Sequence, residues 1–102
     1  MRVQYMLTDD VISKNKTEIE RFIYNCQLLN GTTDLELTLV DINPYQTRRL
    51  FEMLGWKVEW QDENSTDRWY TCSNKDYNFI ITIMIDTDIF DITLYAELDE
   101  GK

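Results

Sequence analysis

The side chains in this sequence whose types and spacing could do chemistry are carboxylates of the C-terminal half. Asp86, Asp88 and Asp91 lie close together, as oxygen ligands of calcium do. The stretch lacks the central Gly and the terminal Glu of an EF-hand loop, so we interpret these aspartates as turn residues that keep a hairpin tip soluble. Pairs such as Asp62 and Glu63, or Asp88 and Asp91, could perform acid–base catalysis only in a buried setting that separates their pKa values.

The sequence contains no histidine, which is the commonest acid–base residue and the commonest metal ligand. Catalytic triads and zinc sites that use imidazole are therefore excluded. Cys26 and Cys72 are the only cysteines, and we expect both to be core residues rather than a disulfide. We expect no metal, no cofactor and no enzymatic activity.

The net charge of −9 is unevenly distributed along the chain. Residues 1–58 hold eight acidic and seven basic residues, whereas residues 59–100 hold eleven acidic and two basic ones. Because phosphates require a basic surface, we do not expect direct nucleic-acid binding. A basic partner protein is expected instead, since complementary charge speeds encounter and sets specificity. Carboxylates two residues apart on a strand are separated by roughly 6.6–6.8 Å and could stand in for successive phosphates.

The residues that we expect to form this partner-binding surface are acidic, with one aromatic among them. Tyr95 falls on the polar face of its strand, beside Asp91, Thr93 and Glu97. An exposed aromatic residue among acids is typical of a hot spot for a protein partner. The complete predicted set is Asp62, Glu63, Asp67, Asp86, Asp88, Asp91, Tyr95, Glu97, Asp99 and Glu100.

The elements that must position these side chains are predicted from hydrophobic periodicity. Residues 77–98 read as a hairpin whose two arms alternate apolar and polar residues, with residues 86–88 as the turn. Apolar stripes and capping signals predict a helix over 9–29, starting at either residue 9 or residue 18, and a second helix over 43–55. Further strands are predicted over 34–42, 56–61 and 68–73.

This order, α-β-α-β-β-β-β, predicts an α+β fold with two helices packed on one face of a mostly antiparallel sheet of about five strands. Val40 and Ile42 make the strand over 34–42 apolar on both faces, which indicates a central strand covered on both sides. Trp56, Val58 and Trp60 share one face and are expected in the core.

The length of 102 residues indicates a single domain, residues 1–102. The N-terminus lacks the apolar run of a signal peptide, and no apolar run is long enough to span a membrane. We therefore expect a cytoplasmic protein with no membrane partner.

The run LVDINPYQTRRLFEMLGWKVEW resembles the opening of the vicinal-oxygen-chelate module and a segment of GNAT-type acetyltransferases. The first resemblance implies strand-borne metal ligands from His, Gln or Glu and a paired second module, and this chain has no His and no second module. The second implies a Gly-rich turn for the pyrophosphate of coenzyme A, whereas the three Gly residues here are scattered. The resemblance therefore extends to a strand–helix–Gly–strand architecture.

Four functional hypotheses follow from the sequence. The first is a small acidic binding inhibitor, encoded by a phage or mobile element, that blocks a basic nucleic-acid-binding surface of a host protein such as a nuclease. This is a nucleic-acid mimic of the anti-CRISPR class of counter-defence proteins. The second is an immunity protein that neutralises a nuclease toxin, and the third is a small metal-dependent or enzymatic module on the strand–helix–strand joint. The fourth is a structural homodimer that pairs through strand 34–42 or strand 90–98.

Overall fold

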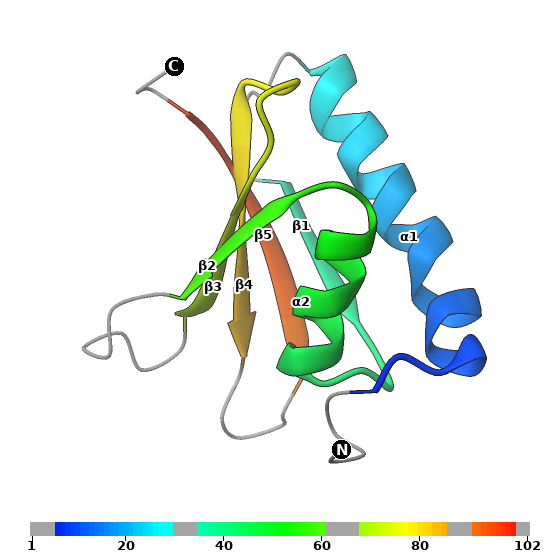
Figure 1. The fold of residues 1–102 in the computed structure, drawn as a ribbon. Coiled ribbons are helices and arrows are strands. Elements are labelled where there is room, and N and C mark those ends of the chain that lie inside the picture. The colour runs from blue at the N-terminus through cyan, green and yellow to red at the C-terminus, as the bar shows by residue number, and fades with distance from the viewer. Residues whose placement is uncertain (1–5, 30–34, 61–67, 86–90, 100–102) are drawn as a thin grey trace.

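Five antiparallel strands form one sheet, and two helices lie together on one of its faces (Figure 1). The structure is a computed structural model that describes residues 6–29, 35–60, 68–85 and 91–99. The predicted element order and the α+β fold are confirmed. The elements are α1 (Asp9–Leu28), β1 (Leu35–Leu39), α2 (Pro44–Met53), β2 (Lys57–Trp60), β3 (Arg68–Ser73), β4 (Phe79–Ile85) and β5 (Ile92–Leu98).

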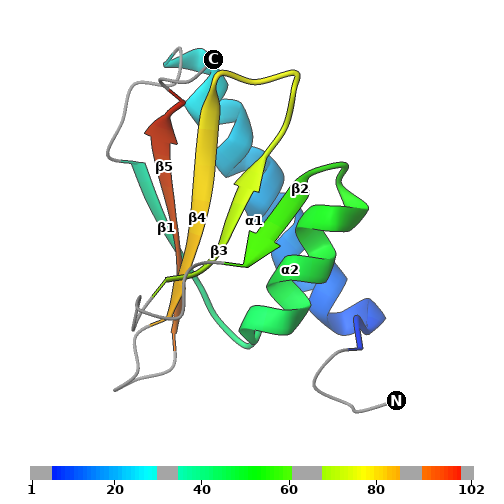
Figure 2. The same cartoon turned by 60° about the vertical axis from the view of Figure 1, so that its left-hand side comes forward.

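The hairpin of β4 and β5 is the centre of the sheet, whose strand order is β1-β5-β4-β3-β2. Ile81 lies opposite Ala96 and Ile83 lies opposite Leu94, and all four side chains are buried. Period-two alternation puts these residues on the face that α1 and α2 cover, seen from two directions in Figures 1 and 2. The predicted hairpin therefore supplies the floor of the hydrophobic core.

Helix α1 begins at the first of its two predicted start signals. The Thr8 hydroxyl accepts a hydrogen bond from the Val11 backbone N–H (3.2 Å) and caps the helix. The second start signal, at Thr17, lies inside α1, so the helix does not begin there. The apolar stripe that this helix buries is Ile19, Phe22, Ile23 and Cys26.

Helix α2 has the capping box that its sequence predicts. The Gln46 backbone N–H donates to Asn43 Oδ1 (2.8 Å), and the Asn43 backbone N–H donates to Gln46 Oε1 (3.1 Å). After the helix, Gly55 adopts a φ of +92°, a conformation that favours glycine. The chain then turns into β2, and the Trp56 backbone N–H donates to the Phe51 carbonyl (3.0 Å).

The prediction that strand 34–42 is central and covered on both sides is wrong. Among the described residues, β1 lies at an edge of the sheet and pairs with β5 alone. It ends at Leu39, and Asp41 takes a positive φ of 57° as the chain turns toward α2. Val40 is 61% exposed and Ile42 is buried. The apolar run that suggested two-sided burial is therefore an edge strand followed by a turn.

The prediction that Trp56 and Trp60 both lie in the core is right for Trp56 and wrong for Trp60. Trp56 is buried just before β2, where its ring stacks on Tyr77 at 5.2 Å between centroids. Trp60 is 61% exposed, although its ring edge contacts the buried ring of Tyr70 at 5.3 Å. Trp60 is exposed because β2 is the other edge strand and Trp60 is its last residue.

The two faces of β4 can be tested with a pair of identical substitutions. Replacing the buried Ile81 with Ala should lower the free energy of unfolding by about 2–5 kcal/mol, because it leaves a cavity in the core. Ile80→Ala, at the neighbouring half-buried position on the opposite face, should cost clearly less. Chemical denaturation measures both variants, and equal losses would contradict the assignment of the faces.

Candidate protein-binding face of the sheet

The face of the sheet that points away from the helices, here called the outer face, carries the described part of the predicted binding surface. Along β5, Ile92, Leu94 and Ala96 are buried. The residues between them point the other way, so Thr93, Tyr95 and Glu97 lie on the outer face. Figure 2 shows both helices on the opposite side of the sheet.

The strand register assembles one continuous row of side chains across the outer face. Tyr95 lies opposite Glu36 on β1 and opposite Thr82 on β4. Thr82 lies opposite Thr71 on β3, and Thr71 lies opposite Glu59 on β2. Neighbouring strands are spaced by about 4.8 Å, so the two glutamates at the ends of this row are roughly 19 Å apart. The sheet therefore holds two carboxylates at fixed positions on either side of a tyrosine.

The charge of the outer face is predominantly negative. Glu36, Glu59 and Glu97 lie on its strands, and Asp91 and Asp99 lie just before and just after β5. Lys57 shares this face, and its Nζ lies 2.9 Å from Glu59 Oε1. That hydrogen bond and the charge of Glu59 raise the pKa of Lys57. One lysine offsets one of the three glutamates on these strands.

The centre of the outer face is less polar than its margin. Thr82 is only 3% exposed, because the side chains around it cover it. Ile80 and Met84 on the same strand are half-buried, as is Tyr95. An apolar centre that contains a tyrosine, with charged residues around it, is the anatomy of a protein–protein interface.

Four of the ten predicted binding residues lie in the part of the chain that the structure describes. Tyr95 and Glu97 lie on one face, as the alternation predicts, and Asp91 directly precedes β5. Asp99 continues the ladder through its backbone N–H, which donates to the Asn78 carbonyl (2.9 Å). The remaining predicted residues lie outside the described residues. They are Asp62, Glu63, Asp67, Asp86, Asp88 and Glu100.

The predicted binding set omits two carboxylates of the outer face: Glu36, which the sequence did not single out, and Glu59, which belongs to the acidic C-terminal stretch. The alternation of Glu36 with three leucines does place it on the polar face of its strand. What the sequence does not give is the pairing of β1 with β5, which sets Glu36 directly beside Tyr95.

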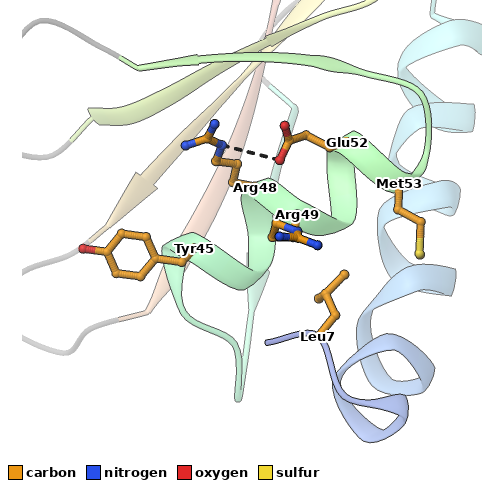
Figure 3. Close-up of a pocket in the computed structure, with 6 residues that line it drawn as sticks. All are labelled: Leu7, Tyr45, Arg48, Arg49, Glu52 and Met53. Atoms are coloured by element: carbon orange, nitrogen blue, oxygen red, sulfur yellow. Dashed lines mark ion pairs between the residues drawn. The ribbon is translucent and has the colours of Figure 1, made fainter. Parts of the chain in front are cut away.

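The helical side of the molecule has a different charge balance. Helices α1 and α2 together carry five basic and five acidic residues. A shallow hollow of about 660 Å³ lies over α2, lined by Leu7, Tyr45, Arg48, Arg49, Glu52 and Met53 (Figure 3). Arg48 pairs with Glu52 (3.4 Å) and stacks over the ring of Tyr70 (5.5 Å). Figure 3 shows the two arginines pointing in different directions, so they do not converge on a common ligand position.

Comparison of the chain with protein-family models, with curated proteins and with solved structures finds no match. Among the described residues, no three His, Cys, Asp or Glu side chains are grouped closely enough to hold a metal ion. No helix within the described ranges is long and apolar enough to cross a membrane.

The two cysteines are buried thiols in the core and are not part of the outer face. Burial raises the pKa of Cys26 to about 11, and burial raises the pKa of Cys72 further. Both groups are therefore neutral near pH 7 and poor nucleophiles, since the thiolate is the reactive form.

The raised pKa of Cys26 predicts a loss of stability in alkali. The native thiol stays protonated up to about pH 11, whereas the unfolded thiol ionises near its ordinary value of 9.0, so the unfolded state binds fewer protons between these values. The free energy of unfolding should therefore fall as the pH rises from 9 to 11. Chemical denaturation at a series of pH values measures this free energy. It should fall less steeply with pH for Cys26→Ala than for the unmodified chain, and an equal pH dependence of the two would contradict the raised pKa of Cys26.

Proposed function

We propose that this chain is a small binding protein whose outer face occupies a basic, nucleic-acid-binding surface of another protein and thereby blocks it. The observation that carries the proposal is the composition of that face, where Glu36 and Glu97 lie beside the half-buried Tyr95 and Glu59 lies three strands away at the opposite edge. The basic residues of the described chain lie mostly on the two helices. The charge is thus segregated in space as well as along the sequence.

The geometry of the face suits competition with a nucleic acid. A β-sheet holds its backbone at fixed spacings, so the positions from which these carboxylates project are set before the partner arrives. An ordered surface loses less conformational entropy on binding than a flexible acidic tail does. The carboxylates would attract the arginines and lysines that otherwise hold phosphates, and Tyr95 would supply the apolar anchor.

The partner class that fits this chemistry is a nucleic-acid-handling protein such as a nuclease. Two biological settings share it: counter-defence by a phage or mobile element, of the anti-CRISPR kind, and immunity to a nuclease toxin. Both settings use the same electrostatics, so the identity of the captured protein distinguishes them.

Charge reversal on the outer face tests the proposal. The chain should capture a basic nucleic-acid-binding protein from a host lysate, and salt or added duplex DNA should release that protein, because ionic contacts are screened and DNA competes for the same surface. The double variant Glu36→Lys, Glu97→Lys should bind the captured protein at least about tenfold more weakly, because the face loses its complementary charge. Titration with the purified partner, with and without DNA, measures this.

The matched control is Glu18→Lys, Glu20→Lys, which makes the same change of charge on the exposed side of α1. It should bind almost as the unmodified chain does. Equal weakening by both double variants would mean that only the net charge matters, and a captured protein that salt and DNA do not release would contradict the proposal.

Tyr95 should contribute a separate, apolar part of the binding energy. Tyr95→Ala should weaken binding by about 2 kcal/mol or more, the usual effect of removing a hot-spot aromatic residue. This loss should persist at high salt, because it does not depend on charge. Tyr24→Ala on α1, where the tyrosine is exposed, provides the comparison and should leave the affinity unchanged. Normal binding by Tyr95→Ala would show that Tyr95 is not part of the interface.

A further inference from the structure

The edge of β1 that faces away from β5 carries backbone hydrogen-bonding groups with no strand partner in the described part of the chain. Edge strands that avoid pairing with other chains are often very short or contain Pro, a bulge or charged side chains, especially Lys. β1 has the sequence LELTL, with one glutamate and neither Pro nor Lys, and its register with β5 runs without a bulge. The opposite edge of the sheet differs, because β2 carries Lys57. β1 is therefore the edge that is suited to receive another strand.

An exposed apolar residue directly follows β1, because Val40 is 61% exposed. The C-terminal end of α1 lies toward the end of the molecule where β1 begins (Figures 1 and 2), and its last residue, Leu28, is 61% exposed. An antiparallel second copy would bring the Val40 end of one β1 toward the first residue of the other.

The sequence of β1 is self-complementary in one antiparallel register. A two-fold axis perpendicular to the sheet keeps the helices of both copies on the same side. With the axis at Leu37, all five residues are paired, and Leu35 lies opposite Leu39 of the second copy. Glu36 then lies opposite Thr38 of the second copy. An axis at Glu36 would instead place two glutamates directly opposite each other, which is destabilising.

We propose that β1 is a homodimerisation edge, through which two copies of this chain form one continuous antiparallel sheet centred on Leu37. The proposal does not depend on the proposed function of the outer face. A five-residue edge makes a contact smaller than the standard interface of about 1,600 Å². The dimer is therefore weak and forms in a concentration-dependent way.

Opposite charges at one position test the register. In the proposed dimer, Thr38→Glu places a glutamate opposite Glu36 of the second copy at two symmetry-related positions, so the dimer dissociation constant should rise by about tenfold. Thr38→Lys places a lysine there and should lower the dissociation constant. Sedimentation velocity of the full chain over a wide concentration range at low ionic strength measures both changes, and thermal unfolding confirms that each variant is folded.

The control pair is Thr17→Glu and Thr17→Lys, which makes the same substitutions at an exposed position of α1. These variants should shift the dimer equilibrium much less, and in proportion to net charge only. The proposal is overturned if the unmodified chain stays monomeric up to millimolar concentration. A strand of another protein would then be the candidate partner of the β1 edge. The proposal is also overturned if the two Thr38 variants move the equilibrium in the same direction, or no further than the Thr17 variants do.

Discussion

The fold depends on burying one apolar face of the sheet beneath the two helices of the described chain. The inward side chains of β4 and β5, Ile81, Ile83, Leu94 and Ala96 among them, expose large apolar area unless a second layer covers them. Helices α1 and α2 provide that layer with one stripe each, and Leu50 and Phe51 of α2 are fully buried in it. Because both helices lie on this side, the outer face of the described part of the chain takes its character from the side chains of the strands themselves.

The sequence predicted the features that depend on neighbouring residues and did not predict those that depend on contacts between distant strands. Local signals were sufficient for the elements: the Asn43–Gln46 capping box and the alternation along residues 79–85 and 92–98 depend on neighbours in the chain, and each is found where expected. The sidedness of Tyr95 and Glu97 followed from the same alternation. Pairing between distant strands could not be predicted, because the alternation of a strand says which residues share a face and says nothing about which strand lies beside it.

Two errors arose because strand pairing could not be predicted: β1 was expected at the centre of the sheet, and Glu36 was left out of the candidate surface. Apolar residues on both sides of a short run are expected of a central strand, but Val40 and Ile42 belong to the turn that follows β1. Once β1 is known to pair with β5, Glu36 and Tyr95 become direct neighbours, and the acidic surface acquires a member from the nearly neutral half of the chain. The surface is thus a property of the assembled sheet.

The pairing of β1 with β5 also governs the order of events when the chain is made. Leu35 lies opposite Ala96, so one strand pair closes across most of the sequence, whereas β4 and β5 are joined by a short connection. Contacts between residues so distant in sequence pay a large loop-closure entropy and slow folding. During synthesis, α1 and β1 emerge first and have no sheet to join until β5 has been translated. β1 can therefore join the sheet only after β5 has been translated, and until then its leucines are not covered by the assembled core.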